Sequence, residues 1–281
     1  MATADSNLVI AGYDAAPEAA DGLALAHLLA QLTHRDLLVA RVIPDVADHP
    51  GATRAEQLHV REIVQSTHTA MLAIVPDASV ELMPVLDPAV AHGLHDLART
   101  QDASLIVLGS SHHSGAGRVL LGGTVEQVVN GAPCPVAVAP PHFNDDPAIA
   151  PRLIGVAWDG TAPAKAALAL AADLAGIAGY GLLVINVHPT LAHRPIGRLR
   201  GDLDDGVALA RELAPAEIEV TGTQRSGDPA GELIATTTEE VGLLVVGSRA
   251  HGPLARVLLG SVSGHVTRSA HAPVLVVPAP S

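Results

Sequence analysis

The sequence predicts an α/β fold of two tandem doubly wound domains, each with a mainly five-stranded parallel sheet and helices on both faces. The first observation is the set of continuous apolar runs such as "SLIVLG" and "GLLVVG", which are typical of strands in a covered parallel sheet. The second is their alternation with alanine-rich amphipathic segments such as "AKAALALAADLAG", which predict helices, here with Gly176 as a stop signal. The third is that the whole pattern occurs twice.

The two copies correspond segment by segment. "VIAGYDAAPEAADGLALAHLLA", from Val9, matches "IGVAWDGTAPAKAALALAADLA", from Ile154. "DLLVARVIPD" then matches "GLLVINVHPT", and "APCPVAVAP" matches "AHAPVLVVP". We therefore predict domains at residues 1–142 and 152–281. The segment "PPHFNDDPAIAP" has proline at both ends and acidic residues inside, so we expect residues 143–151 to form an exposed linker.

Composition excludes several classes of partner. The 281 residues carry a formal net charge of −13, which argues against nucleic acid or an anionic membrane. One Trp, two Tyr and one Phe leave a core of Val, Leu, Ile and Ala, without stacking platforms for single strands. Cys134 is the sole cysteine, which suits a reducing compartment. Neither a signal-peptide pattern nor an apolar run of the ~20 residues that span a bilayer is present, so we expect a cytoplasmic protein.

The strongest chemical signal is a glycine-rich turn that appears in both copies. In the second copy, Gly247 follows the strand "GLLVV" and Gly260 precedes the helix "SVSGHVTRSA". Gly247 lets the chain turn sharply, and Gly260 lets the backbone come close to a bound group. The first N–H groups of the helix have no intrahelical acceptor and can bind an anion. With the hydroxyls of Ser261 and Ser263 as further donors, the sequence predicts a phosphate site built mostly from backbone.

These residues resemble the nucleotide-binding branch of the universal stress protein family. That branch has Gly, two residues, Gly, nine residues, and then Gly with Ser or Thr. The second copy reads "GSRAHGPLARVLLGS", with Ala250 at the second Gly. The first reads "GSSHHSGAGRVLLGG", with His112 at that Gly and Gly123 at the Ser or Thr. The resemblance runs through "GYD", "AWDG", "GDPA" and "APCPV", and it implies an adenine-nucleotide α-hydrolase-like fold.

The resemblance also implies ATP, alone or with Mg²⁺, in both copies. Asp14 and Asp159 would lie by the adenosine, Val42 and Val187 would contact adenine through their backbone, and the glycine-rich loops would hold the phosphates. The candidate residues of the first copy are Gly12, Asp14, Val42, Gly109, Ser110, Ser111, His112, His113, Gly115, Arg118, Gly122, Gly123 and Thr124. Those of the second are Ala157, Asp159, Val187, Gly247, Ser248, Arg249, Ala250, His251, Gly252, Arg256, Gly260, Ser261, Val262 and Ser263.

Simpler interpretations stand beside these. The glycines can be turn residues without a ligand, and Asp14 and Asp159 can cap the helices that follow them. Arg118 and Arg256 fit a surface role as well as a phosphate contact. The dipeptides Asp87-Pro88 and Asp228-Pro229 favour helix starts.

Histidine and cysteine give no metal or nucleophile prediction. His92 and His95 lie three apart, and His112 and His113 are adjacent, but neither pair has a Cys or carboxylate at ligand spacing. We therefore expect solvent-exposed histidines and no metal site. Cys134, between two prolines, is expected to be a small buried residue.

The predicted function is a regulatory ATP-binding protein of the stress response, without efficient turnover. No Gly-Lys-Ser or Gly-Lys-Thr phosphate loop and no kinase catalytic loop is present. A nucleotide-free interaction module of the same fold and a weak ATPase remain as alternatives. The family further implies a homo-oligomer, with the two copies paired through "PVAVA" and "PVLVV" and a dimer of whole chains.

Overall fold

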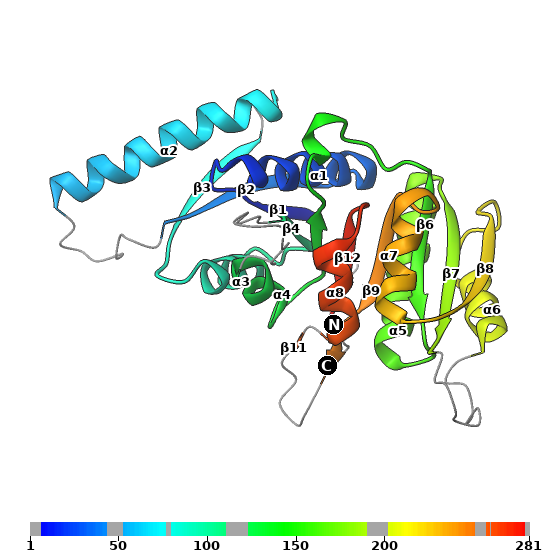
Figure 1. The fold of residues 1–281 in the computed structure, drawn as a ribbon. Coiled ribbons are helices and arrows are strands. Elements are labelled where there is room, and N and C mark those ends of the chain that lie inside the picture. The colour runs from blue at the N-terminus through cyan, green and yellow to red at the C-terminus, as the bar shows by residue number, and fades with distance from the viewer. Residues whose placement is uncertain are drawn as a thin grey trace. The chain divides into compact units, whose positions relative to one another are not determined.

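The computed structural model describes residues 7–43, 53–76, 80–110, 123–189, 202–250, 257–258 and 260–278. It divides into two compact units, Ala2–Pro147 and Ala148–Ser281 (Figure 1). Within the described ranges, no helix is long and apolar enough to cross a membrane.

The first unit is a parallel sheet in the order β3-β2-β1-β4-β5. Its chain builds outward from β1 on one side and then returns to the other side through β4, so the strand order reverses between β1 and β4. In Figure 1, α1 lies on one side of these strands and α3 and α4 on the other. The elements are β1 (Leu8–Gly12), α1 (Pro17–Thr33), β2 (Asp36–Ile43), α2 (Arg54–Ile74), β3 (Glu81–Leu86), α3 (Val90–Thr100), β4 (Leu105–Gly109), α4 (Gly123–Val129), β5 (Val136–Ala139) and the 3-10 turn η1 (Phe143–Asp145).

The second unit repeats this arrangement in the order β12-β9-β6-β7-β8. The strand order reverses between β6 and β9. A short antiparallel pair, β10 with β11, is an addition that the sequence did not predict. The elements are β6 (Leu153–Trp158), α5 (Ala162–Ala178), β7 (Gly181–His188), α6 (Leu203–Leu213), β8 (Val220–Ser226), α7 (Pro229–Glu239), β9 (Leu243–Gly247), β10 (Arg249–Ala250), β11 (Val257–Leu258), α8 (Ser261–Ser269) and β12 (Val274–Val277). The predicted fold class, two doubly wound α/β domains, is confirmed.

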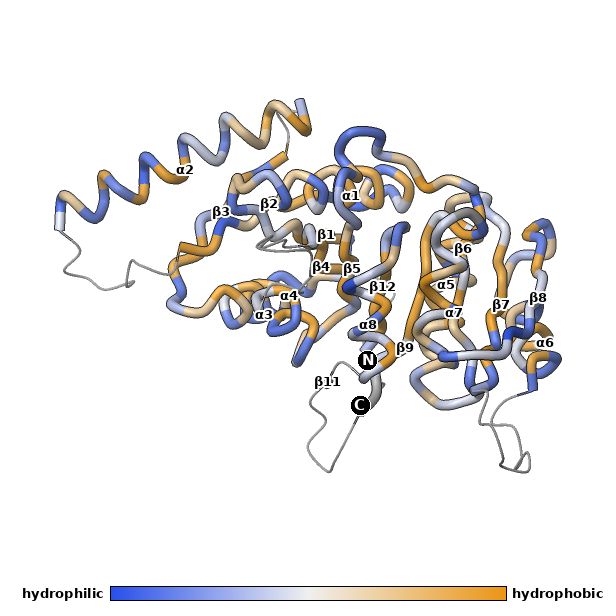
Figure 2. Tube along the Cα trace, viewed as in Figure 1, coloured by the Kyte–Doolittle hydropathy of each residue, from blue (hydrophilic) through white to orange (hydrophobic). Residues whose placement is uncertain are grey.

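The core of each unit is aliphatic, as predicted. All residues of β5 and β12 are buried, and so are the first four of β4 and of β9. Figure 2 shows these strands as the apolar part of the chain. Three of the four aromatic side chains belong to the core as well, because Tyr13, Phe143 and Trp158 are each less than 10% exposed.

Helix α5 corrects one prediction. It begins at the N-cap Thr161, whose side chain accepts from the Ala164 N–H, and it continues past Gly176 to end at Gly179 in the left-handed conformation. Gly176 is small for a different reason, since a Cβ there would lie 2.8 Å from the Pro215 ring. A glycine near a helix end was therefore mistaken for the stop signal that the residue three positions later supplies.

The segment that connects the units is not uniformly exposed. The carboxylate of Asp21, a buried residue of α1, accepts hydrogen bonds from the N–H groups of His142 (3.1 Å) and Asn144 (2.9 Å). Phe143 is 7% exposed and Ile149 is 5% exposed. The expected exposure of 143–151 is therefore wrong at these two side chains, because apolar residues inside the proline-bounded segment pack against the fold.

Candidate functional site

The predicted residues that the structure describes gather at the carboxyl ends of strands, next to the point where the strand order reverses. In the first unit, Gly12 ends β1 and Gly109 ends β4, and these two strands are parallel neighbours. Asp14 follows β1 by two residues and is exposed. Doubly wound sheets bind ligands in this place, because the loops on either side of the reversal point leave a crevice between them.

The second unit brings the equivalent residues to the same place. Ala157 and Asp159 lie at and just beyond the end of β6, Val187 lies on β7, and Gly247 ends β9. The strand β6 pairs with both β7 and β9. Ser248 follows β9, is fully buried, and has no hydrogen-bond partner for its hydroxyl among the described residues.

The two aspartates shape the turn ahead of a helix, but neither is the helix cap. Oδ1 of Asp14 accepts from the N–H of Ala16 at 3.0 Å, and Ala16 is the N-cap residue of α1. Oδ1 of Asp159 accepts from both the N–H (3.1 Å) and the hydroxyl (2.5 Å) of Thr161, which is the N-cap of α5. The capping interpretation is therefore wrong in detail, since each carboxylate orders the residue that caps the helix.

The glycines that end β4 and β9 have a packing role. A Cβ on Gly109 would lie 1.9 Å from the carbonyl oxygen of Glu18, and one on Gly247 would lie 2.6 Å from that of Pro163. Neither glycine has a positive φ. The expected sharp turn at Gly247 is therefore not the reason for glycine. The first turn of α1 in the first unit, and of α5 in the second, passes so close to the strand end that no side chain fits.

The sequence predicted phosphate binding at two helix starts, those of α8 and α4. Gly260 is the N-cap of α8 and has no side-chain cap, and Ser261 is exposed. The hydroxyl of Ser263, in contrast, is buried and donates to the Gly260 carbonyl at 3.3 Å. The expectation that both hydroxyls act as donors to a ligand is therefore wrong for Ser263, and for Ser261 it stays a prediction.

The first-unit helix α4 begins at Gly123, where a Cβ would meet no atom within 4 Å. Thr124 follows and is exposed. Ser110, at the other side of the loop, is buried, and its N–H donates to the Ala139 carbonyl at 3.1 Å. The helix start is thus open, while the strand end is packed.

Several predicted residues lie outside the described part of the chain. Arg249 and Ala250 are described only through the backbone of β10, which pairs with β11. Outside the described residues lie Ser111, His112, His113, Gly115, Arg118, Gly122, His251, Gly252 and Arg256.

The other two predicted backbone contacts lie on inner strands. Val42 is 8% exposed on β2, and its Cγ1 would contact a Cβ added to Gly93 of α3 at 3.3 Å. Val187 is half-buried on β7. A Cβ on Gly12 would clash with Leu108 at 2.6 Å, so Gly12 packs against the core while its backbone remains at the strand end.

Sequence reasoning missed the residues beside each aspartate. Tyr13 and Trp158 precede Asp14 and Asp159, and both are buried. Burial raises the pKa of Tyr13 above its usual value, the charge of Asp14 raises it further, and that of Arg41 lowers it. The signal that could have found these residues was in the alignment of the copies, which sets Tyr13 against Trp158.

The histidine prediction is right at one residue of α3 and wrong at another. The side chain of His92 is 70% exposed, and its Nδ1 lies 2.6 Å from Oδ2 of Asp87. His95 is buried, with its Nε2 2.6 Å from the Val128 carbonyl oxygen. No group of three or more His, Cys, Asp or Glu side chains that could hold a metal ion occurs among the described residues. Cys134 is buried as predicted, and burial raises the pKa of its thiol to about 12.

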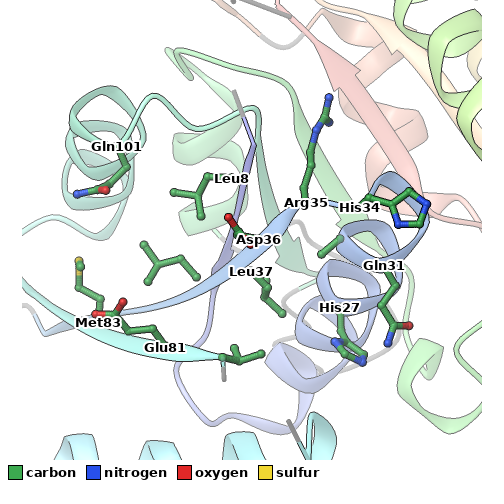
Figure 3. A pocket seen from close by; sticks show the side chains of 13 residues that line it. Leu8, His27, Gln31, His34, Arg35, Asp36, Leu37, Glu81, Met83 and Gln101 are labelled. Atoms are coloured by element: carbon green, nitrogen blue, oxygen red, sulfur yellow. The ribbon is translucent and has the colours of Figure 1, made fainter. Parts of the chain in front are cut away.

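The described residues also line a cavity of about 660 Å³ at the opposite, amino-terminal edge of the first sheet (Figure 3). His27 of α1 and His34, the residue that caps its carboxyl end, lie on one side, and Asp36 and Glu81 lie at the starts of β2 and β3. None of the predicted site residues lines it. Because ligands of doubly wound sheets bind at carboxyl ends, the predicted sites remain the better candidates.

Comparison with known proteins places the chain in a family. The universal stress protein family matches it twice, over residues 7–140 and 151–278. The universal stress protein Rv2623 of Mycobacterium tuberculosis is 30% identical, and the alignment covers 98% of each chain. Rv2005c of the same organism is 33% identical over 63% of this chain and 62% of its own length.

A solved structure supports the fold. The crystal structure of a universal stress protein from Archaeoglobus fulgidus DSM 4304 superposes with a TM-score of 0.72 at 22% identity, covering 98% of this chain and all of the other. This likeness extends over both units. The chain therefore belongs to the universal stress protein family and carries two of its domains in tandem.

Proposed function

We propose that this protein is a regulatory ATP-binding member of its family, with one adenine nucleotide at the carboxyl edge of each sheet. The observation that supports the proposal best is the arrangement of candidate residues in the second unit. There Asp159 follows β6, the buried Ser248 follows β9, and the uncapped helix α8 leads into β12, the strand next to β9. A buried hydroxyl without a partner is costly, and a ligand oxygen can supply one.

The helix start favours an anionic ligand group. The first three N–H groups of α8 precede the first intrahelical bond, which the Gly264 N–H donates to Gly260. These N–H groups and the helix dipole attract a phosphate. Asp159, already oriented by Thr161, would accept a hydrogen bond from a ribose hydroxyl.

A nucleotide-free interaction module is the second candidate. It is favoured by the packing role of Gly109 and Gly247, because these glycines are required by the neighbouring helix with or without a ligand. Weak ATP hydrolysis is a third class, and phosphate release that is lost in Asp159→Ala would support it.

The test is the nucleotide content of protein purified without added nucleotide. The protein is denatured, and the supernatant is analysed by anion-exchange chromatography at the adenine absorbance, with and without prior chelation of Mg²⁺. We expect one ATP per unit. Gly123→Val and Gly260→Val should each remove one of the two, because a side chain there blocks close approach of the phosphates. Gly123→Val should not disturb the fold, since a Cβ added at Gly123 would meet no atom within 4 Å. Absence of nucleotide, together with no thermal shift on adding Mg-ATP, would overturn the proposal in favour of the interaction module.

A further inference from the structure

Arg41 is half-buried, and two of its side-chain nitrogens are buried without an acceptor among the described residues. It lies on β2, one residue before Val42. Its Nε and Nη1 atoms are buried, and neither has a hydrogen-bond partner among the described residues. A guanidinium group stays charged at every physiological pH, so this cost cannot be relieved by losing a proton.

The neighbourhood of Arg41 follows from the strand register. Gly12 pairs with Ala40, and the Tyr13 N–H donates to the Ala40 carbonyl at 3.0 Å. Val42 faces α3, where Gly93 approaches its side chain. Because side chains alternate along a strand, Arg41 projects from the other face.

Tyr13 projects from the same face as Arg41. Gly12, the residue before it, is directed toward Leu94 of α3, so alternation directs Tyr13 away from that helix. Arg41 and Asp14 are also the two charges that act on the pKa of the Tyr13 hydroxyl. A buried aromatic side chain and a cation therefore stand together at the carboxyl edge of β1 and β2.

The second unit has no cation at this position. The repeat sets Asn186 against Arg41 and Trp158 against Tyr13. Nδ2 of Asn186 donates to the Trp158 carbonyl at 2.9 Å, and Nε1 of Trp158 donates to the Asp202 carbonyl at 3.0 Å. At this position the second unit has two neutral side chains that donate to carbonyl groups of its own backbone. The first unit instead has two donors, Nε and Nη1 of Arg41, without an acceptor among the described residues.

We propose that Arg41 binds an oxyanion in the first unit, a phosphate group of a small ligand that the second unit does not hold in this way. The Nε–H and Nη1–H groups of a guanidinium can each donate a charge-assisted hydrogen bond to an anionic oxygen such as that of a phosphate. The proposal goes beyond nucleotide binding, because the aspartate turn and the glycine-rich loop occur in both units and only the first has the cation. The phosphate can be free or part of a nucleotide, and the experiment separates the two sources.

The experiment is calorimetric titration of the full chain with inorganic phosphate, ATP and adenosine. It uses the wild type, Arg41→Met, Arg41→Lys and the matched control Arg35→Met, which removes the same charge at the amino end of β2. We expect the affinity for phosphate to fall about tenfold or more in Arg41→Lys and to vanish in Arg41→Met. Arg35→Met should bind as the wild type does. Arg41→Met should fold, because the buried Nε and Nη1 make no hydrogen bond among the described residues that the substitution would break.

Comparison of the titrations with inorganic phosphate, ATP and adenosine identifies the source of the oxyanion. If Arg41→Met also weakens ATP but leaves adenosine unchanged, the phosphate belongs to the nucleotide. If ATP binding is unchanged while phosphate binding is lost, the oxyanion site is separate, and it stands even if the ATP proposal fails. Phosphate binding that is absent in the wild type, or equal in Arg41→Met and wild type, overturns the inference whatever the nucleotide content of the protein.

Discussion

The crossover helices α2 and α6 occupy the same place in the two copies but are held very differently. The second-unit helix α6 has 11 residues and receives the ring of Trp158 against Gly206, where a Cβ would lie 2.7 Å from the indole Nε1. The first-unit helix α2 has 21 residues, of which only Thr67 and Met71 are buried. Figure 1 shows the difference in length.

The difference shows which part of a duplicated domain is free to change. Both copies keep the strand, the aspartate turn and the glycine that lets a helix start pass the strand end. They differ in one pair of equivalent residues, which is Tyr13 with Arg41 in the first copy and Trp158 with Asn186 in the second. The indole of Trp158 donates to the carbonyl of Asp202, the N-cap residue of α6, and so holds this helix against the sheet. In the first unit, Nε and Nη1 of Arg41, near Tyr13, have no acceptor among the described residues and are available as donors to a ligand.

We expect the largest loss of stability in Trp158→Ala, because this substitution removes the side chain that packs against α6 in the second unit. Loss of a buried Trp destabilises by about 3–5 kcal/mol, and the hydrogen bond to Asp202 is lost with it. Urea unfolding followed by far-ultraviolet circular dichroism measures the loss. Hydrogen exchange should show the α6 amides becoming as unprotected as those of residues 54–66 in α2, which bury no side chain. Unchanged protection of α6 would contradict the idea that Trp158 holds it.

Gly109→Ala and Gly247→Ala sharpen the comparison at the shared position. A new Cβ would meet a backbone oxygen at 1.9 Å in the first unit and 2.6 Å in the second. Backbone cannot move aside as a flexible side chain does, so we expect losses of about 1–3 kcal/mol or more, with Gly109→Ala the larger. The control is Gly123→Ala, whose Cβ meets nothing within 4 Å. Equal midpoints for Gly109→Ala and this control would be the contrary result.

Asp228→Ala tests a helix start that only one copy caps. Asp228 is the N-cap of α7 and accepts from the Gly231 N–H at 2.8 Å, so its removal should cost about 1 kcal/mol. In the first copy Asp87 lies two residues before the N-cap Ala89 of α3. The predicted helix start at an Asp-Pro pair is thus confirmed for α7 and wrong for α3. The thermal unfolding midpoint should fall further in Asp228→Ala than in Asp87→Ala.

The smallest effect is a titration difference confined to the first copy. The hydrogen bond to Asp87 raises the pKa of His92, whereas burial lowers the pKa of His95 despite its hydrogen bond to the Val128 carbonyl. Proton NMR titration should place the His92 midpoint above 6.5, the ordinary value, and the His95 midpoint below it. Both midpoints on one side of 6.5 would be inconsistent with the structure.

The two histidines carry opposite signs in the pH dependence of stability. The raised pKa of His92 contributes stability below the unfolded-state pKa, which is lost as the pH rises through the folded value. The lowered pKa of His95 makes stability fall as the pH drops below the unfolded-state pKa toward the folded one. His95→Gln should therefore reduce the loss of stability in mild acid, whereas His92→Gln should not.

Much of the fold could be predicted from the sequence, because its signals are local. Apolar runs and alanine-rich stretches specify strands and helices over a few residues. Because the chain is duplicated, the matching segment of the other copy supported the main predicted elements. The candidate site followed from the same logic, since strand ends and helix starts in a doubly wound sheet meet at one edge. The packing reason for Gly109 was not predictable, because it depends on Glu18, far away in the chain.

The sequence by itself determined the duplication, the order of elements and the positions of the aspartate turns, since each depends on short-range pattern. Tertiary structure decided which polar groups are satisfied. His95 is buried because α4 offers it the Val128 carbonyl, and Asp21 is buried because the chain returns to bring it two N–H groups. Arg41 keeps two unused donors, because no described neighbour offers its Nε or Nη1 an acceptor. Burial and hydrogen bonding are properties of residues brought together from distant parts of the chain, and no local pattern encodes them.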